Sequence, residues 1–262
     1  MAAAGPARSG RLDDASGDTA GERRGERFDL AAIAPQPWKN GAGITREIAF
    51  GGPSTAAFDW RLSVADIDRD APFSAFPGID RCIVLLQGGG MRLRAHDQSV
   101  DHALTETLAP FRFAGEIALD ASLAAGPSRD LNVMTRRGAW RSDVSVLRDQ
   151  GAVSRAGLAL LLCVAGHWRV DGARLAPMQG WVFALQPDPQ RPAHPLPSTG
   201  SAPERREHLP AAPTSAAAHD TRVVRLQPEH QPGEPAARWR PEAGQPSAPA
   251  VLVVHLHPDR PR

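Results

Sequence analysis

Short apolar runs, each ended by glycine or proline, constrain the fold of this chain more than any other feature. Residues 58–65 alternate apolar with polar or small side chains, the period of a half-buried β-strand. Residues 81–86 are apolar after the first position and are followed by three glycines. Further short runs occupy residues 91–94, 111–113, 117–119 and 130–135. Because the amphipathic-helix candidates are all short, the pattern predicts an all-β antiparallel sandwich or barrel.

An internal repeat refines this prediction. A strand, a glycine turn, a second strand, Leu-Ala-Pro and a third strand occur in this order twice. The two copies span residues 83–113 and 160–183. Two such β units predict a double-stranded β-helix (jelly-roll) architecture, a bicupin-like barrel with few short helices.

A proline-rich segment divides the chain. Residues 187–250 contain 14 of the 25 prolines, which rules out regular strands or long helices over most of this segment. The apolar run that follows must be buried, and we expect it to return to the main sheet. The predicted organisation is a disordered tail (1–27), a bicupin-like β domain (28–186), a mostly disordered insertion (187–250), a returning strand (251–257) and a tail (258–262). Within the insertion, residues 222–226 could form a lone strand.

Composition excludes several classes of function. The formal net charge is +1 and the arginines are scattered, so nothing favours nucleic acid or an acidic membrane surface. The longest apolar run is too short to span a bilayer, and residues 1–27 lack the apolar core of a signal peptide. Cys82 and Cys163 lie in apolar runs, which is typical of free thiols in a core. These features predict a soluble cytoplasmic protein.

Scarce residues point to one stretch. Lys39 is the only lysine, and asparagine occurs only at Asn40 and Asn132. An ammonium group differs physically from the guanidinium that replaces it elsewhere in the chain. A Lys-Asn pair between Trp38 and a Gly-x-Gly turn therefore indicates a functional requirement, although chance survival is the simpler explanation for either residue alone.

These residues belong to a series of motifs that resembles the HutD/Ves family. The series begins with Pro-Trp-Lys-Asn-Gly-Ala-Gly-Ile-Thr-Arg-Glu-Ile at residues 37–48. Similar motifs follow in order at residues 60–65, 73–81, 111–116 and 126–138. Ala42 stands where the family usually has glycine, and the resemblance is absent from residues 187–250.

The resemblance implies a cupin-type double jelly roll. It also implies a role beside histidine utilisation, in which the protein binds a small pathway metabolite and modulates flux, and another branch of the family is stress-related. Fold transfers between relatives more safely than function does.

We expect a metal-free pocket for a small carboxylate, such as a ligand similar to formylglutamate or urocanate. Arginine can bind a carboxylate with two parallel hydrogen bonds, and asparagine amides suit a formamido group. The expected ligand-binding residues are Lys39, Asn40, Arg61, Ser63, Asp130, Asn132 and Met134. The expected pocket wall is formed by Trp38, Trp60, Phe73 and Phe76.

The structural alternative is an internal salt-bridge network that pairs Arg61 with Asp130 and Arg81 with Asp80, because buried charges need partners. We favour this structural interpretation for Arg46, Glu47, Asp80 and Arg81, and ligand binding for Lys39, Asn40, Arg61 and Asn132. In the binding interpretation, Asp130 orients Arg61 or accepts from a ligand N–H.

Other functions are kept as alternatives. A metal-dependent cupin needs at least three protein ligands, whereas only His255 and His257 share a strand face, so no metal and no cofactor is expected. Metal-free catalysis by Lys39 or Asp130 as base is the second choice after binding. A protein-interaction role through residues 187–250 is the third, and a homodimer is left open.

Overall fold

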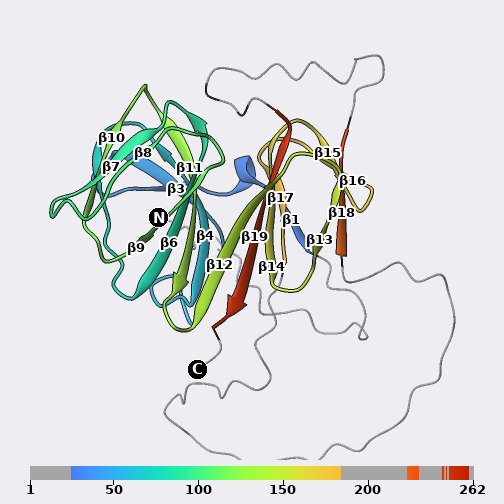
Figure 1. Cartoon of the computed structure of the whole chain (residues 1–262), viewed down its shortest axis with the longest axis horizontal. Coiled ribbons are helices and arrows are strands. Elements are labelled where there is room, and N and C mark those ends of the chain that lie inside the picture. The colour runs from blue at the N-terminus through green and yellow to red at the C-terminus, as the bar shows by residue number, and fades with distance from the viewer. Residues whose placement is uncertain (1–24, 184–222, 230–243, 245, 247, 260–262) are drawn as a thin grey trace, which may run out of the picture.

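The computed structural model describes residues 25–183, 223–229, 244, 246 and 248–259, and this part of the chain is almost entirely β-structure (Figure 1). Its one helix, the 3-10 turn η1 (Leu30–Ala32), links the first two strands. The strands are β1 (Glu26–Asp29), β2 (Gln36–Pro37), β3 (Gly43–Gly51), β4 (Trp60–Ile67), β5 (Ala71–Phe73), β6 (Ile79–Gly88), β7 (Met91–Ala95), β8 (Asp101–Leu104), β9 (Pro110–Ala114), β10 (Leu119–Leu123), β11 (Ser128–Arg136), β12 (Trp140–Leu147), β13 (Gly151–Ser154), β14 (Leu158–Ala165), β15 (Trp168–Val170), β16 (Ala173–Leu175), β17 (Gln179–Val182), β18 (Val223–Pro228) and β19 (Ala250–Pro258).

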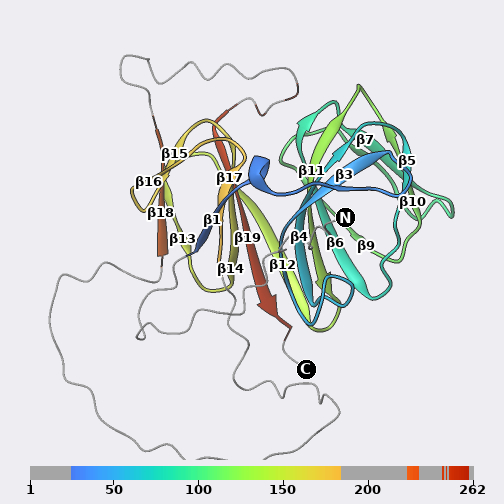
Figure 2. The same ribbon diagram turned by 180° about the vertical axis from the view of Figure 1, so that it is seen from behind.

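The strands form two modules, each built from two facing sheets (Figures 1 and 2). The first module combines a six-stranded sheet of order β2-β3-β4-β11-β6-β9 with a four-stranded sheet of order β5-β10-β7-β8. The second module combines a five-stranded sheet of order β1-β17-β14-β19-β12 with a four-stranded sheet of order β13-β18-β15-β16. All of the strand pairs are antiparallel, as the alternating patterns predict.

The second module is completed by segments from both ends of the described chain. Strand β1 pairs with β17, and β19 lies between β12 and β14. Strand β18 falls within residues 187–250, and it is not the lone strand that the sequence suggests there, because it pairs with β13 on one side and β15 on the other. Most of residues 1–27 and 187–250, for which we predict disorder, lies outside the described residues.

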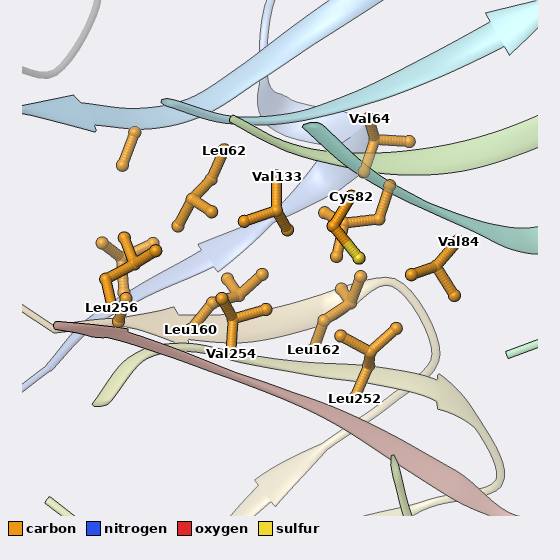
Figure 3. Packing of buried hydrophobic residues seen from close by; sticks show 14 of the residues in the cluster. Leu62, Val64, Cys82, Val84, Val133, Leu160, Leu162, Leu252, Val254 and Leu256 are labelled. Atoms are coloured by element: carbon orange, nitrogen blue, oxygen red, sulfur yellow. The ribbon is translucent and has the colours of Figure 1, made fainter. Parts of the chain in front are cut away.

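The modules are joined by an apolar layer between the six-stranded and five-stranded sheets (Figure 3). Leu62, Val133 and Cys82 face this layer from the first module, and Leu160 and Val254 face it from the second. Their side chains are at most 1% exposed. Each of these sheets is therefore covered on both faces, because its other face closes the interior of its own module.

The predicted jelly-roll architecture is confirmed. In the described residues the facing sheets form sandwiches of strands without closing into a barrel. The two copies of the sequence repeat occupy equivalent places: β6 pairs with β9 in the first module, and β14 pairs with β17 in the second. Cys82 and Cys163 are buried free cysteines, as predicted. No helix in the described part of the chain is long and apolar enough to cross a membrane.

Candidate functional site

A cavity of about 620 Å³ lies in the first module. Its wall combines side chains of the six-stranded sheet, residues of β5 and the loop after it, and the segment around β2. The volume is in the range of ordinary small-molecule sites. The lining residues are Gln36, Pro37, Trp38, Lys39, Asn40, Thr45, Arg61, Ser63, Ala65, Pro72, Phe73, Ser74, Phe76, Arg81, Asp130, Asn132 and Met134.

Strand register brings the polar side chains together. Met134 on β11 pairs with Arg61 on β4 and with Arg81 on β6, so the three side chains form one row across the sheet. In the neighbouring row, Asn132 pairs with Ser63. Directly paired residues of antiparallel strands point to the same face, and residues two apart along a strand do so as well. The sheet therefore directs Arg61, Arg81, Ser63 and Asn132, together with the apolar Met134, into the first module.

The rim of the cavity is a tight turn that carries Lys39 and Asn40. The Trp38 N–H donates to the Gly43 carbonyl at 2.9 Å, and the Gly41 N–H donates to the Trp38 carbonyl at 3.0 Å. Gly41 has φ +67°, a left-handed conformation that glycine adopts without a steric penalty. The Asn40 Oδ1 accepts from the Ala42 N–H at 3.1 Å, so its amide NH₂ is the group left for a ligand.

Strand β3 holds both the turn and one of the cavity cations. The Trp38 Nε1–H donates to the Thr45 hydroxyl at 2.8 Å, and the Trp38 ring packs edge-on against Phe73. Two residues further along β3, Glu47 accepts from the Arg61 Nε–H at 2.8 Å. The Glu47 side chain is 4% exposed and that of Arg61 is 17% exposed. Thr45 and Glu47 thus share a strand face and position Trp38 and Arg61.

Arg81 is the most deeply placed cation of the cavity, at 6% exposure. Its guanidinium carbon lies 5.4, 5.5 and 5.0 Å from the ring centroids of Phe73, Phe76 and Phe113. It donates from Nε to the Asn132 Oδ1 at 3.3 Å and from a terminal nitrogen to the Ser74 carbonyl at 3.2 Å. Burial lowers the pKa of Arg81 to about 10, so the group is charged at neutral pH. Three aromatic rings and two hydrogen bonds hold this charge in one place.

Asp130 is the most unusual group in the cavity wall. It is 1% exposed, and neither carboxylate oxygen has a hydrogen-bond partner among the described residues. Burial raises its pKa to about 7, against the opposing effect of the Arg81 charge, while Asp66 raises it further. Buried carboxylates are normally hydrogen-bonded or paired, so an unpaired one beside a cavity is a candidate functional group.

The structure brings the expected ligand-binding residues into a single cavity. All seven of them line it, and so do three of the four expected wall residues, Trp38, Phe73 and Phe76. Trp60 is the exception: it is 5% exposed and packs in the apolar layer between the modules. It precedes Arg61 on β4, and successive strand residues point to opposite faces, so Trp60 cannot share a wall with Arg61.

The expected salt-bridge pairs are wrong. Arg61 pairs with Glu47 rather than with Asp130. Asp80 pairs with Arg137, because Asp80 and Arg81 are neighbours on β6 and face opposite sides. Arg81 itself lines the cavity. Its alternation with Ile83 and Leu85, which are buried inside the first module, is the sequence signal that could have identified it.

The histidines in the described part of the chain do not assemble into a metal centre. Among the described residues, no group of three or more His, Cys, Asp or Glu side chains could hold a metal ion. His255 and His257 stack on each other, with ring centroids 6.0 Å apart. His255 contacts the Ser154 carbonyl at 3.0 Å, and His257 lies 3.5 Å from an Asp143 oxygen.

Two stacked jelly-roll modules, with a polar cavity in one of them, define a cupin-like two-module protein. Within this class, the chain belongs to the HutD family, whose family model, described as HutD, matches residues 30–189. Protein Ves of Citrobacter koseri is 37% identical over 159 residues, which cover 59% of this chain and 81% of that protein. Protein Ves of Escherichia fergusonii is 35% identical over 156 residues, with the same two coverages.

Solved structures support the same fold. The structure of HutD from Pseudomonas fluorescens SBW25 matches with a TM-score of 0.60 and 21% identity, over 89% of this chain and 98% of that one. The conserved protein of unknown function PA5104 from Pseudomonas aeruginosa PAO1 matches with a TM-score of 0.58 and 24% identity, over 88% and 97% of the two chains. At this level of identity the likeness concerns the fold alone.

Proposed function

We propose that this protein binds a small carboxylate metabolite in the cavity of the first module. The observation that carries the proposal is the surplus of hydrogen-bond donors over acceptors in the cavity wall. Lys39 supplies an exposed cation, Arg61 a partly buried one and Arg81 a buried one. A carboxylate accepts hydrogen bonds only, so it complements such a wall.

The asparagine orientations add to this surplus. The Oδ1 of Asn40 is engaged by a backbone N–H, and the Oδ1 of Asn132 is engaged by Arg81. Both partners are donors only, so each amide turns its oxygen toward that partner. Each side chain therefore has its NH₂ group available for a ligand.

The ligands that we favour are formylglutamate and urocanate-like carboxylates. The role implied by the family resemblance, in which the bound metabolite modulates histidine utilisation in the cytoplasm, is part of this proposal. We infer binding rather than turnover as the primary activity.

Isothermal titration with N-formyl-L-glutamate and with urocanate tests the proposal. We expect saturable binding by the wild-type chain. Arg61→Gln should weaken it by about 10-fold or more, because a charge-assisted hydrogen bond in a partly buried site contributes about 1.5–3 kcal/mol. The matched control is Arg94→Gln, which removes an arginine on β7 whose side chain is 58% exposed. Equal losses in the two variants, or no binding of any small carboxylate by the wild type, would contradict the proposal.

A second candidate function is metal-free acid–base catalysis on the bound carboxylate. It is favoured by the position of Asp130, whose pKa burial raises to about 7, close to the pH at which a general acid or base is most effective. Incubating the protein with each binding carboxylate and following the products by NMR tests this candidate. Turnover that disappears in Asp130→Asn, while binding persists, would establish it; absence of turnover with every bound ligand would exclude it for those ligands.

A further inference from the structure

Asp130 sets a requirement that a simple carboxylate cannot meet. Both of its oxygens lack hydrogen-bond partners within the described residues, although the side chain lines the cavity. Its neighbours on the same face are Ala65, opposite it on β4, and Leu85, opposite it on β6, and neither side chain can donate a hydrogen bond. The missing donor therefore has to come from whatever occupies the cavity.

Next to this acceptor lies a fixed pair of donors. Asn132, two residues along β11, faces the same side as Asp130 and has its NH₂ group available. Arg81 is anchored beside it by the Asn132 oxygen and the Ser74 carbonyl. The base of the cavity thus presents donors and one acceptor side by side. An amide group, with a carbonyl and an N–H on neighbouring atoms, has the complementary arrangement.

We propose that Asp130 makes the cavity selective for carboxylates that also carry an amide-type N–H. Asp130 accepts this N–H, and the Asn132 and Arg81 groups donate to the amide carbonyl. The carboxylate of the same ligand binds to the two less buried cations, Lys39 and Arg61. This inference rests on the proposed function and assigns the specificity of the same cavity.

The arrangement also explains which carboxylates are rejected. Above its pKa of about 7 the Asp130 carboxyl is an anion, and a dicarboxylate without an N–H would then place a second anion against it. Like charges in a desolvated site repel strongly. A buried acceptor without a donor also leaves the full free-energy cost of its desolvation uncompensated. Sites built to accept a ligand N–H or O–H discriminate strongly against analogues that lack it.

An isosteric pair of ligands tests the inference directly. In N-acetyl-L-glutamate the acyl group is joined through N–H, and in (S)-2-acetoxyglutarate the same position is an ester oxygen. We expect the wild-type chain to bind the amide at least about 10-fold more tightly than the ester, as measured by isothermal titration. In Asp130→Asn the preference should fall below about 3-fold, because a carboxamide can turn its oxygen to the amide or its NH₂ to the ester.

The controls separate this inference from the proposed function. Asp120→Asn changes a carboxylate on β10 whose side chain is 53% exposed, and it should keep the wild-type preference. Thermal unfolding of each variant verifies that it is folded. Equal binding of amide and ester by the wild type would overturn the inference and leave the proposed function intact. The inference also fails if Asp130→Asn keeps the full preference, and if no small carboxylate binds, both proposals fail together.

Discussion

The two modules share a topology and differ in what fills them. The interior of the second module is packed with apolar side chains, among them Trp168, Leu161, Cys163 and Val251. The interior of the first module is apolar over part of its volume, and the rest is a cavity lined by charged and amide groups. Five of the six buried polar or charged residues in the described chain lie on strands of the six-stranded sheet. The first module therefore carries the free-energy cost of burying polar groups, and the interior of the second module largely avoids this cost.

Equivalent strands show how this difference arises. On β6, Arg81, Ile83 and Leu85 face the interior of the first module, and on β14, Leu161 and Cys163 face the interior of the second. The charged position at the start of β6 has an apolar counterpart at the start of β14, where Leu158 is buried in the second interior. One or two inward-facing polar residues on each of β4, β6 and β11 thus distinguish the lined interior of the first module from the packed interior of the second.

The largest effect is expected from emptying the packed module. Trp168 is completely buried, and its Nε1–H donates to the Ala165 carbonyl at 3.1 Å. Trp168→Ala should lower the free energy of unfolding by about 3–5 kcal/mol, because it leaves a large internal void and removes this hydrogen bond. Urea denaturation measures the loss. Trp168→Phe, which preserves most of the packing, should lose less than half as much.

Ligand binding in the first module should not respond to the same substitution. Where the Trp168→Ala variant is folded, its affinity for a carboxylate should stay within about 2-fold of the wild-type affinity, because distant independent sites behave additively. A parallel loss of affinity and stability would show that the two interiors are coupled and would break the comparison.

The next effect is a pH dependence that originates in the lined module. Folding raises the pKa of Asp130 from 3.8 to about 7 because the group is buried, with Arg81 opposing and Asp66 reinforcing the shift. The protonated form is thus favoured in the folded state. This preference stabilises the folded state fully below pH ~4, and the stabilisation is lost as the pH rises to about 7. The free energy of unfolding changes by roughly 4 kcal/mol at most.

Asp130→Asn lacks this titration, so the difference in unfolding free energy between wild type and variant isolates it from the other carboxylates. Measured in urea at several values between about pH 4 and pH 8, the wild type should lose stability relative to the variant as the pH rises. A difference that stays constant, or grows in favour of the wild type, would mean that Asp130 does not stay protonated over this range when folded.

A matched pair of substitutions compares the two interiors at positions of similar size. Ser63 faces the cavity of the first module, and Cys163 faces the packed interior of the second. Ser63→Val should be neutral or stabilising by up to about 1 kcal/mol, because there is room for the added methyl groups, whereas Cys163→Val should destabilise by about 1 kcal/mol or more through overpacking. Chemical denaturation gives both values.

Ligand binding should respond in the opposite way. Ser63→Val places an apolar group among the polar rows and should weaken carboxylate binding by about 10-fold, while Cys163→Val should leave it unchanged. Comparable effects of the two substitutions on both properties would remove the distinction between a packed and a lined module.

Much of this arrangement follows from local sequence patterns. The period of two on β4 placed Arg61 and Ser63 on one face, and the scarcity of lysine and asparagine identified Lys39, Asn40 and Asn132. These arguments needed only the alternation of strand residues and the composition of the chain. The cavity now contains all of these side chains, together with Arg81.

What the sequence could not provide is the pairing between distant strands. Glu47 partners Arg61 because β3 and β4 are neighbours in the sheet, and a bulge between Glu47 and Ala49 shifts their register. Such a register depends on tertiary packing rather than on either strand alone. For the same reason Asp130 was assigned to Arg61, whereas in the fold it has no hydrogen-bonded partner among the described residues.

The smallest expected effect concerns the rim, where the first module meets solvent. Lys39 is exposed on the turn before Gly41, and the Trp38 and Thr45 hydrogen bonds fix that turn without it. Lys39→Arg should therefore leave the unfolding free energy unchanged within about 0.5 kcal/mol. It should weaken carboxylate binding only about 2-fold to 5-fold, because the charge is kept while the compact ammonium is replaced by a wider planar group. Titration calorimetry of Lys39→Arg and of Lys39→Ala, which removes the charge as well, separates the effect of shape from that of charge. Equal losses of affinity in the two variants would show that the shape of the lysine decides. No loss of affinity in either variant would place the binding energy at the base of the cavity and not at its rim.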